Sequence, residues 1–300
     1  MLLRLATRGS AQATAQSTAV ADALRAAHPG LDVQLVFVET LGDQRADLPL
    51  HTMGGQGVFV KEVQRAVLDG HADLAVHSAK DLPSITADGL HLAAFCARRD
   101  PRDALVGSTL ADLPPGATVA TGSVRRRALL AAERPDLQFV ELRGNIQTRL
   151  SKLPEGGALV MAVAALQILG LTDRIAEALE VDRMVPAPGQ GCVAIECRAG
   201  DAATAALLAA VDHAPTREAV TAERAFLAEL GTGCSLPVAV HAERVDGDLL
   251  LHGFLADPAT GRTARAVASL AIDPAERLSE AATVARDLQA ALAAGGAAEA

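Results

Sequence analysis

The chain has 300 residues and a mass of 30.8 kDa, which is enough for two or three domains. Half of its residues are hydrophobic and 21% are charged, so it can form a globular core and is not disordered as a whole. The formal charge is -9 and the chain contains no tryptophan or tyrosine, which argues against a nucleic-acid partner.

No stretch of the sequence predicts a membrane span. A bilayer requires about 18–20 apolar residues, whereas the longest apolar run, residues 158–166, ends at Gln167. The N-terminal segment carries Arg4 and Arg8 where a signal peptide has its apolar core. We therefore expect a cytoplasmic protein without a membrane partner.

The first two thirds of the chain alternate short strands with helices. Strands are predicted at 2–6, 31–39, 73–76, 90–96, 118–121, 137–142 and 158–163, and helices at 10–27, 58–68, 123–133, 145–153 and 164–169. DPRDAL at 100–105 separates two such series, and PAPGQG at 186–191 marks a second break before the strand CVAIECR. This alternation is typical of an α/β architecture.

The last third follows a different pattern. A helix at 216–230 is followed by strand-like runs at 237–242, 249–255 and 263–271, and then by a closing helix at 274–293. The pair Asp246–Gly247 predicts a tight turn between the first two runs. Together these elements predict an α+β module.

The four cysteines do not form a disulfide framework in a chain of this length. Cys192 and Cys197 are an odd number of residues apart in a predicted strand, so they face opposite sides and no metal site is expected there. Cys234 lies in the loop GTGCSLP, where a thiol is accessible. The alternative for Cys234, an ordinary loop cysteine, would be preferred if this were the only indication.

Positive charge is concentrated in one segment of this acidic chain. Residues 121–152 hold seven Lys/Arg against three Asp/Glu, and six of the seven are arginine. Arg125, Arg126 and Arg127 fall in the first turn of a predicted helix, where the helix dipole disfavours cations unless an anion offsets them. Guanidinium groups bind carboxylates and phosphates bidentately. A solvated helix face is the common alternative, but the arginine excess favours a site for a small acidic ligand.

Polar side chains also follow two other predicted strands. AVHSAKD places Ser78, Lys80 and Asp81 after a buried strand, and ATRGS places Arg8 and Ser10 after the first strand. Ligands of open α/β sheets bind at such strand ends. A helix cap explains any one of these residues, whereas their grouping favours a binding site.

Nine motifs occur in the order typical of the porphobilinogen deaminase, or hydroxymethylbilane synthase, family, which the chain resembles over roughly residues 3–255. They are ATRGS, GGQGVFVKE, AVHSAKDLP, DPRDAL, TGSVRRRALL, ELRGNIQTRLSKL, GQGCVAIECR, VTAERAFL and GTGCSLPVAV. The resemblance implies a monomer with three domains, formed by residues 1–98 with 190–211, by 99–189, and by 212–300. The first two would be α/β domains of the type II periplasmic-binding-protein kind flanking a cleft, and the third an α+β domain that carries Cys234.

The same resemblance implies a transferase of tetrapyrrole (porphyrin and heme) biosynthesis. Such an enzyme joins four porphobilinogen molecules head to tail, releasing ammonia at each step. The growing chain is attached to a dipyrromethane cofactor, which is bound as a thioether to Cys234. Water then releases hydroxymethylbilane, which the next enzyme of the pathway would receive.

Site residues are implied by matching the family's motifs residue by residue. Asp81 would be the catalytic carboxylate. The cofactor would be bound by Cys234, Lys80, Asp81, Ser123, Arg125 and Arg126, and the substrate by Arg8, Ser10, Phe59, Arg143 and Arg149. Each pyrrole carries an acetate and a propionate, so a guanidinium cluster suits the growing chain. A carboxylate can stabilise the positive charge that the loss of ammonia leaves on the substrate and can pass a proton.

The sequence departs from the family's pattern at a few positions. Thr52 and Gln56 stand where many relatives have loop lysines, and Gly122 replaces a hydroxyl residue. His51 is a candidate for part of the missing charge. Two alternatives to an active enzyme remain: a two-lobed binding protein for a small carboxylate, and an inactive relative that keeps only the fold.

Overall fold

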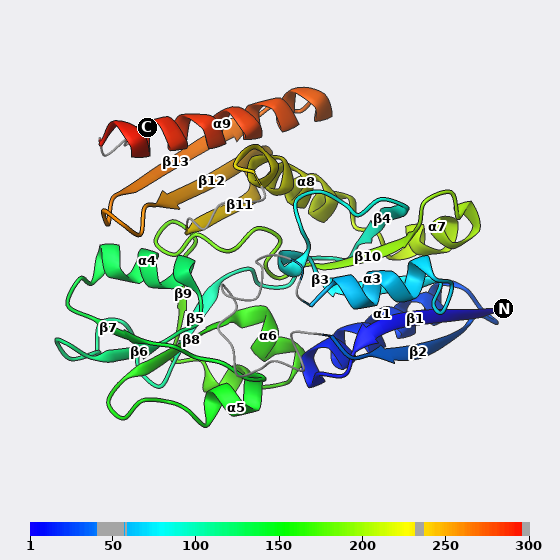
Figure 1. Cartoon of the computed structure of the whole chain (residues 1–300), viewed down its shortest axis with the longest axis horizontal. Coiled ribbons are helices and arrows are strands. Elements are labelled where there is room, and N and C mark those ends of the chain that lie inside the picture. The colour runs from blue at the N-terminus through cyan, green and yellow to red at the C-terminus, as the bar shows by residue number, and fades with distance from the viewer. Residues whose placement is uncertain (41–56, 58, 232–236, 296–300) are drawn as a thin grey trace. The chain divides into compact units, whose positions relative to one another are not determined.

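The structure is a computed structural model that describes residues 1–40, 57, 59–231 and 237–295. The chain divides into two compact units (Figure 1). Unit 1 comprises residues 1–99, 168–170 and 191–217, and unit 2 comprises 100–167, 171–190 and 218–300. The chain thus enters unit 2 after Arg99, returns to unit 1 after Gln190 and enters unit 2 again after Arg217, apart from the short segment 168–170.

Unit 1 contains a five-stranded sheet with the strand order β2-β1-β3-β10-β4. The strands are β1 (Leu2–Arg8), β2 (Asp32–Val38), β3 (Leu74–Ser78), β4 (Leu90–Phe95) and β10 (Val193–Arg198). β1 pairs in parallel with β2 and β3, whereas β10 runs antiparallel to β3 and β4.

Helices cover both faces of the unit 1 sheet. Leu5 and Ala6 of β1 are both fully buried and, as successive strand residues, point to opposite faces. Leu5 belongs to a cluster with Leu24 of α1 (Ala11–Ala27), and Ala6 to one with Val67 of α3 (Lys61–Leu68). The remaining helical segments are a 3-10 turn at Ala79–Asp81, α7 (Ala202–Leu208) and a 3-10 turn at Ala209–Val211.

Unit 2 contains a second five-stranded sheet built on the same plan. Its order is β7-β6-β8-β5-β9, with β6 parallel to β7 and β8, and β5 antiparallel to β8 and β9. The strands are β5 (Asp103–Val106), β6 (Thr118–Ala120), β7 (Gln138–Val140), β8 (Ala158–Ala162) and β9 (Glu177–Leu179). The helices are α4 (Val124–Glu133), α5 (Ile146–Leu150), α6 (Val163–Ile168) and a 3-10 turn at Thr172–Arg174.

In each sheet the antiparallel fourth strand follows a crossing between the units: β5 after Arg99, and β10 after Gln190. This paired arrangement is that of the type II periplasmic-binding-protein fold, and the predicted α/β architecture is confirmed.

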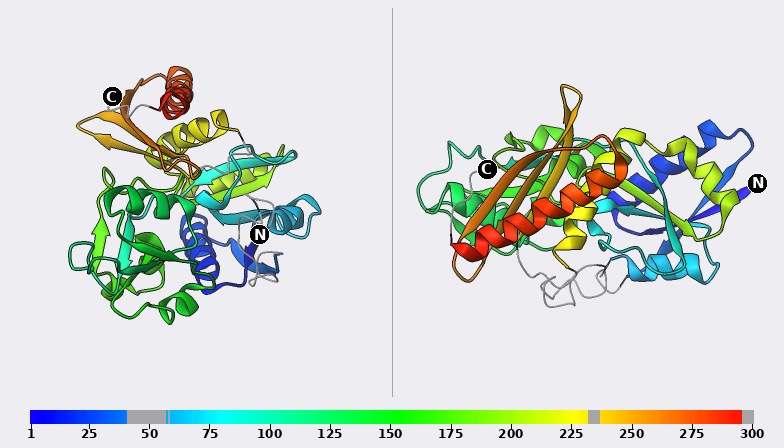
Figure 2. Two further views of the ribbon diagram at one scale, coloured as in Figure 1. Left: turned by 60° about the vertical axis from the view of Figure 1, so that its left-hand side comes forward. Right: turned by 90° about the horizontal axis from the view of Figure 1, so that it is seen from above.

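The C-terminal part of unit 2 is a three-stranded antiparallel sheet packed with helices (Figures 1 and 2). It consists of α8 (Ala214–Glu229), whose first turn to Arg217 belongs to unit 1, and of β11 (Val238–Val245), β12 (Asp248–Ala256), β13 (Thr263–Leu270) and α9 (Pro274–Ala294). Leu251 of β12 is buried with Phe226 of α8 and Leu288 of α9. Asp246 and Gly247, both with positive φ, form the predicted turn between β11 and β12. The predicted α+β module is confirmed.

This module shares a core with the second sheet. Phe254, on the β12 face opposite Leu251, lies in one buried cluster with Leu129 of α4 and Val160 of β8. That shared core explains why residues 218–300 and the second sheet form one compact unit. The division into three domains with the predicted boundaries therefore stays a proposal.

Candidate active site

In unit 1 the predicted polar residues follow two neighbouring parallel strands. β1 ends at Arg8, and β3, which pairs with it, ends at Ser78 and leads into the 3-10 turn that carries Lys80 and Asp81. The backbone N–H of Ala79 donates a hydrogen bond to the Cys192 carbonyl (2.9 Å), which ties this turn to the segment before β10. The paired strands therefore bring both motifs to one edge of the sheet.

Arg8 stacks on an aromatic ring. Its guanidinium carbon lies 4.0 Å from the centroid of the Phe59 ring, so two predicted substrate-binding residues are in contact. Ser10 caps α1, and its hydroxyl oxygen accepts from the backbone N–H of Ala13 (3.3 Å). The Ser10 hydroxyl hydrogen is not used in that bond, so it can still be donated to a carboxylate.

The Asp81 carboxylate is half-buried. It makes no hydrogen bond or ion pair within the part of the chain that the structure describes. Nearby on the chain, the Ser78 hydroxyl donates to Gln16 (3.1 Å) and accepts from Gln12 (3.5 Å). Asp81 therefore presents a carboxylate that the described residues have not saturated with hydrogen bonds.

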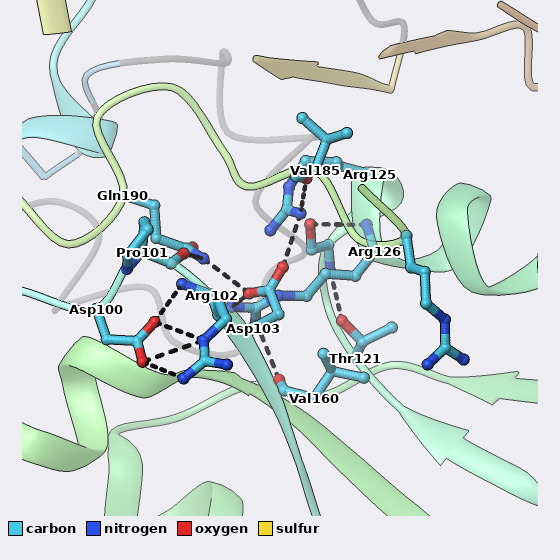
Figure 3. Close-up of polar contacts among 12 residues, drawn as sticks. Asp100, Pro101, Arg102, Asp103, Thr121, Arg125, Arg126, Val160, Val185 and Gln190 are labelled. Carbon is cyan, nitrogen blue, oxygen red and sulfur yellow. Dashed lines mark hydrogen bonds and ion pairs between the residues drawn. The ribbon is translucent and has the colours of Figure 1, made fainter. Parts of the chain in front are cut away.

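In unit 2 two arginines at the start of α4 are buried around one carboxylate (Figure 3). Arg125 is 5% exposed and Arg126 is 7% exposed, and Asp103, the first residue of β5, is fully buried between them. Arg125 Nη1 lies 2.7 Å from Asp103 Oδ2, and Arg126 donates to Oδ1 from Nη2 (2.7 Å) and Nε (3.0 Å). Backbone carbonyls of Val185 (2.7 Å) and Val160 (3.0 Å) accept from the same two guanidiniums.

The electrostatics of this cluster are dominated by burial and charge pairing. Burial alone raises the pKa of the Asp103 carboxyl, but the charges of Arg125 and Arg126 outweigh it and hold that pKa well below its ordinary value. Burial lowers the pKa of the Arg125 guanidinium, and Asp103 opposes that effect. Asp103 is thus the anion that offsets two cations beside the N-terminus of α4.

Among the described residues, one positive charge of the cluster has no counter-charge. Two guanidiniums face one carboxylate, and an uncompensated buried charge is costly. Ser123, the N-cap of α4, accepts from the Arg126 N–H (3.4 Å) and keeps its hydroxyl hydrogen available. This donor set fits the carboxylate groups of an acidic ligand.

Arg143 and Arg149 flank a second helix start in unit 2. Asn145 caps α5, and Arg149 Nε donates to the Gly144 carbonyl (2.8 Å). Arg143 Nη1 is buried and has no hydrogen-bond partner among the described residues. An unsatisfied guanidinium nitrogen is costly unless an acceptor binds to it, so Arg143 also fits a carboxylate ligand.

Gly122 has a steric explanation in this chain. A Cβ atom at this position would lie 2.7 Å from the Leu142 carbonyl oxygen and 2.9 Å from Glu141 Oε1. The segment after β7 therefore lies too close to position 122 for the hydroxyl residue that relatives have there. The hydroxyl of Ser123 is still present next to it.

Replacing Asp103 by asparagine is expected to destabilise unit 2 by about 3–5 kcal/mol at neutral pH, because two buried guanidiniums lose their counter-charge. A lowered carboxyl pKa stabilises the fold above the unfolded-state pKa of about 4. The difference in unfolding free energy between the wild-type protein and Asp103→Asn should therefore persist from neutral pH down to about pH 4 and narrow only below it. Chemical denaturation across this pH range measures it.

Asp136→Asn is the matched control, because Asp136 pairs with Arg134 (2.8 Å) in the same unit but near the surface. Its effect should be much smaller. Equal losses from the two substitutions would contradict the role of Asp103.

The described site residues thus fall into two sets, one in each compact unit. Unit 1 holds Arg8, Ser10, Phe59, Lys80 and Asp81, and unit 2 holds Ser123, Arg125, Arg126, Arg143 and Arg149. Cys234, Thr52, Gln56 and His51 lie outside the described residues. A single site formed by both sets remains a prediction.

Asp103 and Gln190 were not predicted from the sequence as site residues. Gln190 is 1% exposed, and its side-chain amide donates to Asp103 Oδ1 (2.9 Å) and to the Pro101 carbonyl (2.7 Å). Both residues lie in motifs, DPRDAL and GQG, that the sequence analysis used as breaks between elements and as family motifs without assigning either residue a role. The available signal was the run of arginines at a helix start with no acidic residue in the same turn. Such a run indicates that an anion from another part of the chain or from a ligand offsets the charge.

Comparisons with known proteins cover nearly the whole chain. Residues 3–206 match the family described as "Porphobilinogen deaminase, dipyromethane cofactor binding domain", and residues 217–292 match "Porphobilinogen deaminase, C-terminal domain". A porphobilinogen deaminase of Roseiflexus castenholzii is 49% identical over 91% of this chain and 92% of its own length. Another, of Roseiflexus sp. strain RS-1, is 50% identical over 84% of this chain and 85% of its own length.

These matches favour an enzyme over a two-lobed binding protein, because the relatives share both the α/β part and the C-terminal module. No described helix is long and apolar enough to span a bilayer. The chain therefore belongs to the porphobilinogen deaminase (hydroxymethylbilane synthase) family, the dipyrromethane-dependent transferases of tetrapyrrole biosynthesis.

Proposed function

We propose that this chain carries out the family's reaction, the head-to-tail joining of four porphobilinogen molecules with release of ammonia, through the residues of the two sets described above. The observation that carries the proposal is the buried Asp103, Arg125 and Arg126 cluster, with one positive charge left for an acidic ligand. Hydroxymethylbilane is then the product.

The cofactor would be held by residues of both units. Cys234 would anchor it as a thioether, Ser123, Arg125 and Arg126 would bind its carboxylates, and Lys80 would add a further cation. When bound, the dipyrromethane supplies the pyrrole carbon onto which the first substrate unit is added. The net positive charge of the arginine cluster supports this assignment, because each pyrrole carries two carboxylates.

Asp81 would act on the substrate itself. Departure of ammonia leaves positive charge on the aminomethylpyrrole-derived unit, and a carboxylate beside the pyrrole N–H stabilises that charge. The same carboxylate oxygens can accept and return the proton that the joining step requires. The absence of an ion pair or hydrogen bond on Asp81 among the described residues supports this role.

Substrate carboxylates would be bound by the remaining cations. Arg8 is held against Phe59, which orients its guanidinium and gives the pyrrole ring an aromatic neighbour. Ser10, at the same strand end, would donate its hydroxyl hydrogen. In unit 2, Arg143 Nη1 has no hydrogen-bond partner in the described part of the chain, and Arg149 lies one helical turn from the cap of α5.

The test is turnover by the purified chain. Incubation with porphobilinogen should release ammonia and yield the linear tetrapyrrole, in a ratio of about four ammonia molecules per product. Binding of porphobilinogen without ammonia release would instead identify a binding protein or an inactive relative. The same assay shows whether Thr52 and Gln56 support turnover at the positions of the family's loop lysines.

We also propose that the protein is a cytoplasmic monomer with three domains, formed by 1–98 with 190–211, 99–189 and 212–300, and that it passes its product to the next enzyme of the pathway. The chain length and the two five-stranded sheets support the domain division. Light scattering after size-exclusion chromatography tests the monomer, with an expected mass of 30.8 kDa plus the cofactor.

A further inference from the structure

Gln190 is a buried side chain to which the reaction gives no role. It is the last residue of unit 2 before the chain returns to unit 1, and it follows Gly189, whose φ of +70° shapes the turn. Its backbone N–H donates to the Ala187 carbonyl (2.9 Å), and its side-chain amide points at Asp103 (Figure 3). The segment that ends at Gln190 is thus tied directly to the arginine cluster.

The Gln190 amide shares the Asp103 carboxylate with the two guanidiniums. Oδ1 accepts from Gln190 (2.9 Å) and from Arg126 (2.7 and 3.0 Å), which leaves Oδ2 for Arg125 (2.7 Å). Oδ1 is thus held from two sides by hydrogen bonds, whereas Oδ2 makes only the ion pair with Arg125 among the described residues. The Gln190 amide therefore helps to place the carboxylate between the two guanidiniums, which also donate to the Val185 and Val160 carbonyls.

The neutrality of this donor also sets the charge of the cluster. Two guanidiniums and one carboxylate leave one positive charge, and an amide does not change it. The adjacent Arg102 pairs separately with Asp100 (2.8 Å) and with Glu180 (2.6 Å), whose side chain is largely exposed to solvent. A carboxylate at position 190 would cancel the remaining charge and repel Asp103.

Gln190 also joins two of the segments by which the chain crosses between the units. Its amide donates to the carbonyl of Pro101 (2.7 Å), two residues after the first crossing. Within unit 1, the backbone N–H of Arg99 donates to the Gly191 carbonyl (2.9 Å). The segments around these two crossings are thus hydrogen-bonded to each other within unit 1 and again within unit 2. The bond in unit 2 comes from the Gln190 amide, which also donates to Asp103.

We propose that Gln190 is a positioning residue that fixes Asp103 between Arg125 and Arg126 and preserves one net positive charge for a carboxylate of the pyrrole ligand. This inference rests on the proposed function of that cluster. It assigns to Gln190 no contact with the ligand. Gln190 instead affects how readily the unloaded protein takes up its dipyrromethane.

Three variants test the proposal: Gln190→Glu, Gln190→Met, and Gln190→Glu combined with Asp103→Asn. Unloaded protein is incubated with porphobilinogen, and the loaded fraction is read over time from intact masses. Gln190→Glu should load about tenfold more slowly or worse, because one ligand carboxylate loses its charge-assisted partner. Gln190→Met, which removes both donated bonds but no charge, should load a few-fold more slowly.

The double variant is the decisive one, because it exchanges the amide and the carboxylate and restores the net charge. It should recover most of the loading that Gln190→Glu loses. Its KM for porphobilinogen should fall from the Gln190→Glu value toward the wild-type value, with little change in kcat. Gln138→Glu, on the exposed edge strand β7 of the same unit, controls for an added acid and should load normally.

Normal loading of Gln190→Glu, or a double variant no better than Gln190→Glu alone, would overturn the inference. Should Gln190→Glu not fold, normal loading of Gln190→Met would overturn it equally. Wild-type protein that never gains the mass of two pyrrole units would instead refute the proposed function itself, so the two failures are distinguishable.

Discussion

Replacing Asp81 by asparagine is expected to lower kcat by about two to three orders of magnitude, since catalytic proton transfer and charge stabilisation contribute on this scale. Asparagine preserves the size of the side chain but removes its charge and its ability to carry the proton. Asp81 lies on a 3-10 turn fixed by the bond from Ala79 to Cys192 and makes no internal ion pair among the described residues. The melting temperature should therefore stay close to that of the unmodified protein. Steady-state rates of ammonia release measure the effect.

The matched control for this prediction is Asp88→Asn. Asp88 is an exposed aspartate seven residues further along the same unit, and its replacement should leave kcat unchanged. Dipyrromethane content, read from the intact mass, separates a loss of chemistry from a loss of cofactor. A near-normal rate in Asp81→Asn protein that carries its cofactor would refute the catalytic role.

Replacing Cys234 by serine is expected to abolish turnover, because a serine hydroxyl is a far weaker nucleophile than a thiolate and cannot form the thioether. Ammonia release should fall to background, and porphobilinogen should not restore it. Circular dichroism and the melting temperature check that the variant is folded. Substantial tetrapyrrole formation by folded Cys234→Ser protein would contradict the assignment of the anchor.

Cys96→Ser is the control for thiol loss. Burial, together with the neighbouring Asp212 charge, raises the pKa of the Cys96 thiol to about 11. This thiol is therefore protonated and unreactive at neutral pH, so it cannot replace Cys234 as the anchor. The Cys96→Ser variant should keep its cofactor and its rate.

Features set by local hydrogen bonding could be predicted from the sequence. Ser10 and Ser123 were expected at helix starts, and each caps its helix by accepting a backbone N–H three residues ahead. The helix predicted from residue 58 begins at Lys61 instead, and its N-cap residue, Val60, has no side chain able to cap it. Boundaries without a capping signal are thus the less predictable ones.

Features set by long-range pairing could not be predicted in this way. β5 and β9 are short, and each is defined by the strand beside it rather than by its own sequence. Asp103 reaches Arg126 across 23 residues, and Gln190 reaches Asp103 across 87. The arginine run showed that an anion was needed, but only the sheet order shows that β5 supplies it.

The most direct measurement is the mass of the denatured, purified protein. We expect the mass of the polypeptide plus two pyrrole units for the wild-type protein, and the bare polypeptide mass for Cys234→Ser. A fully active preparation whose denatured chain has the bare polypeptide mass would contradict it.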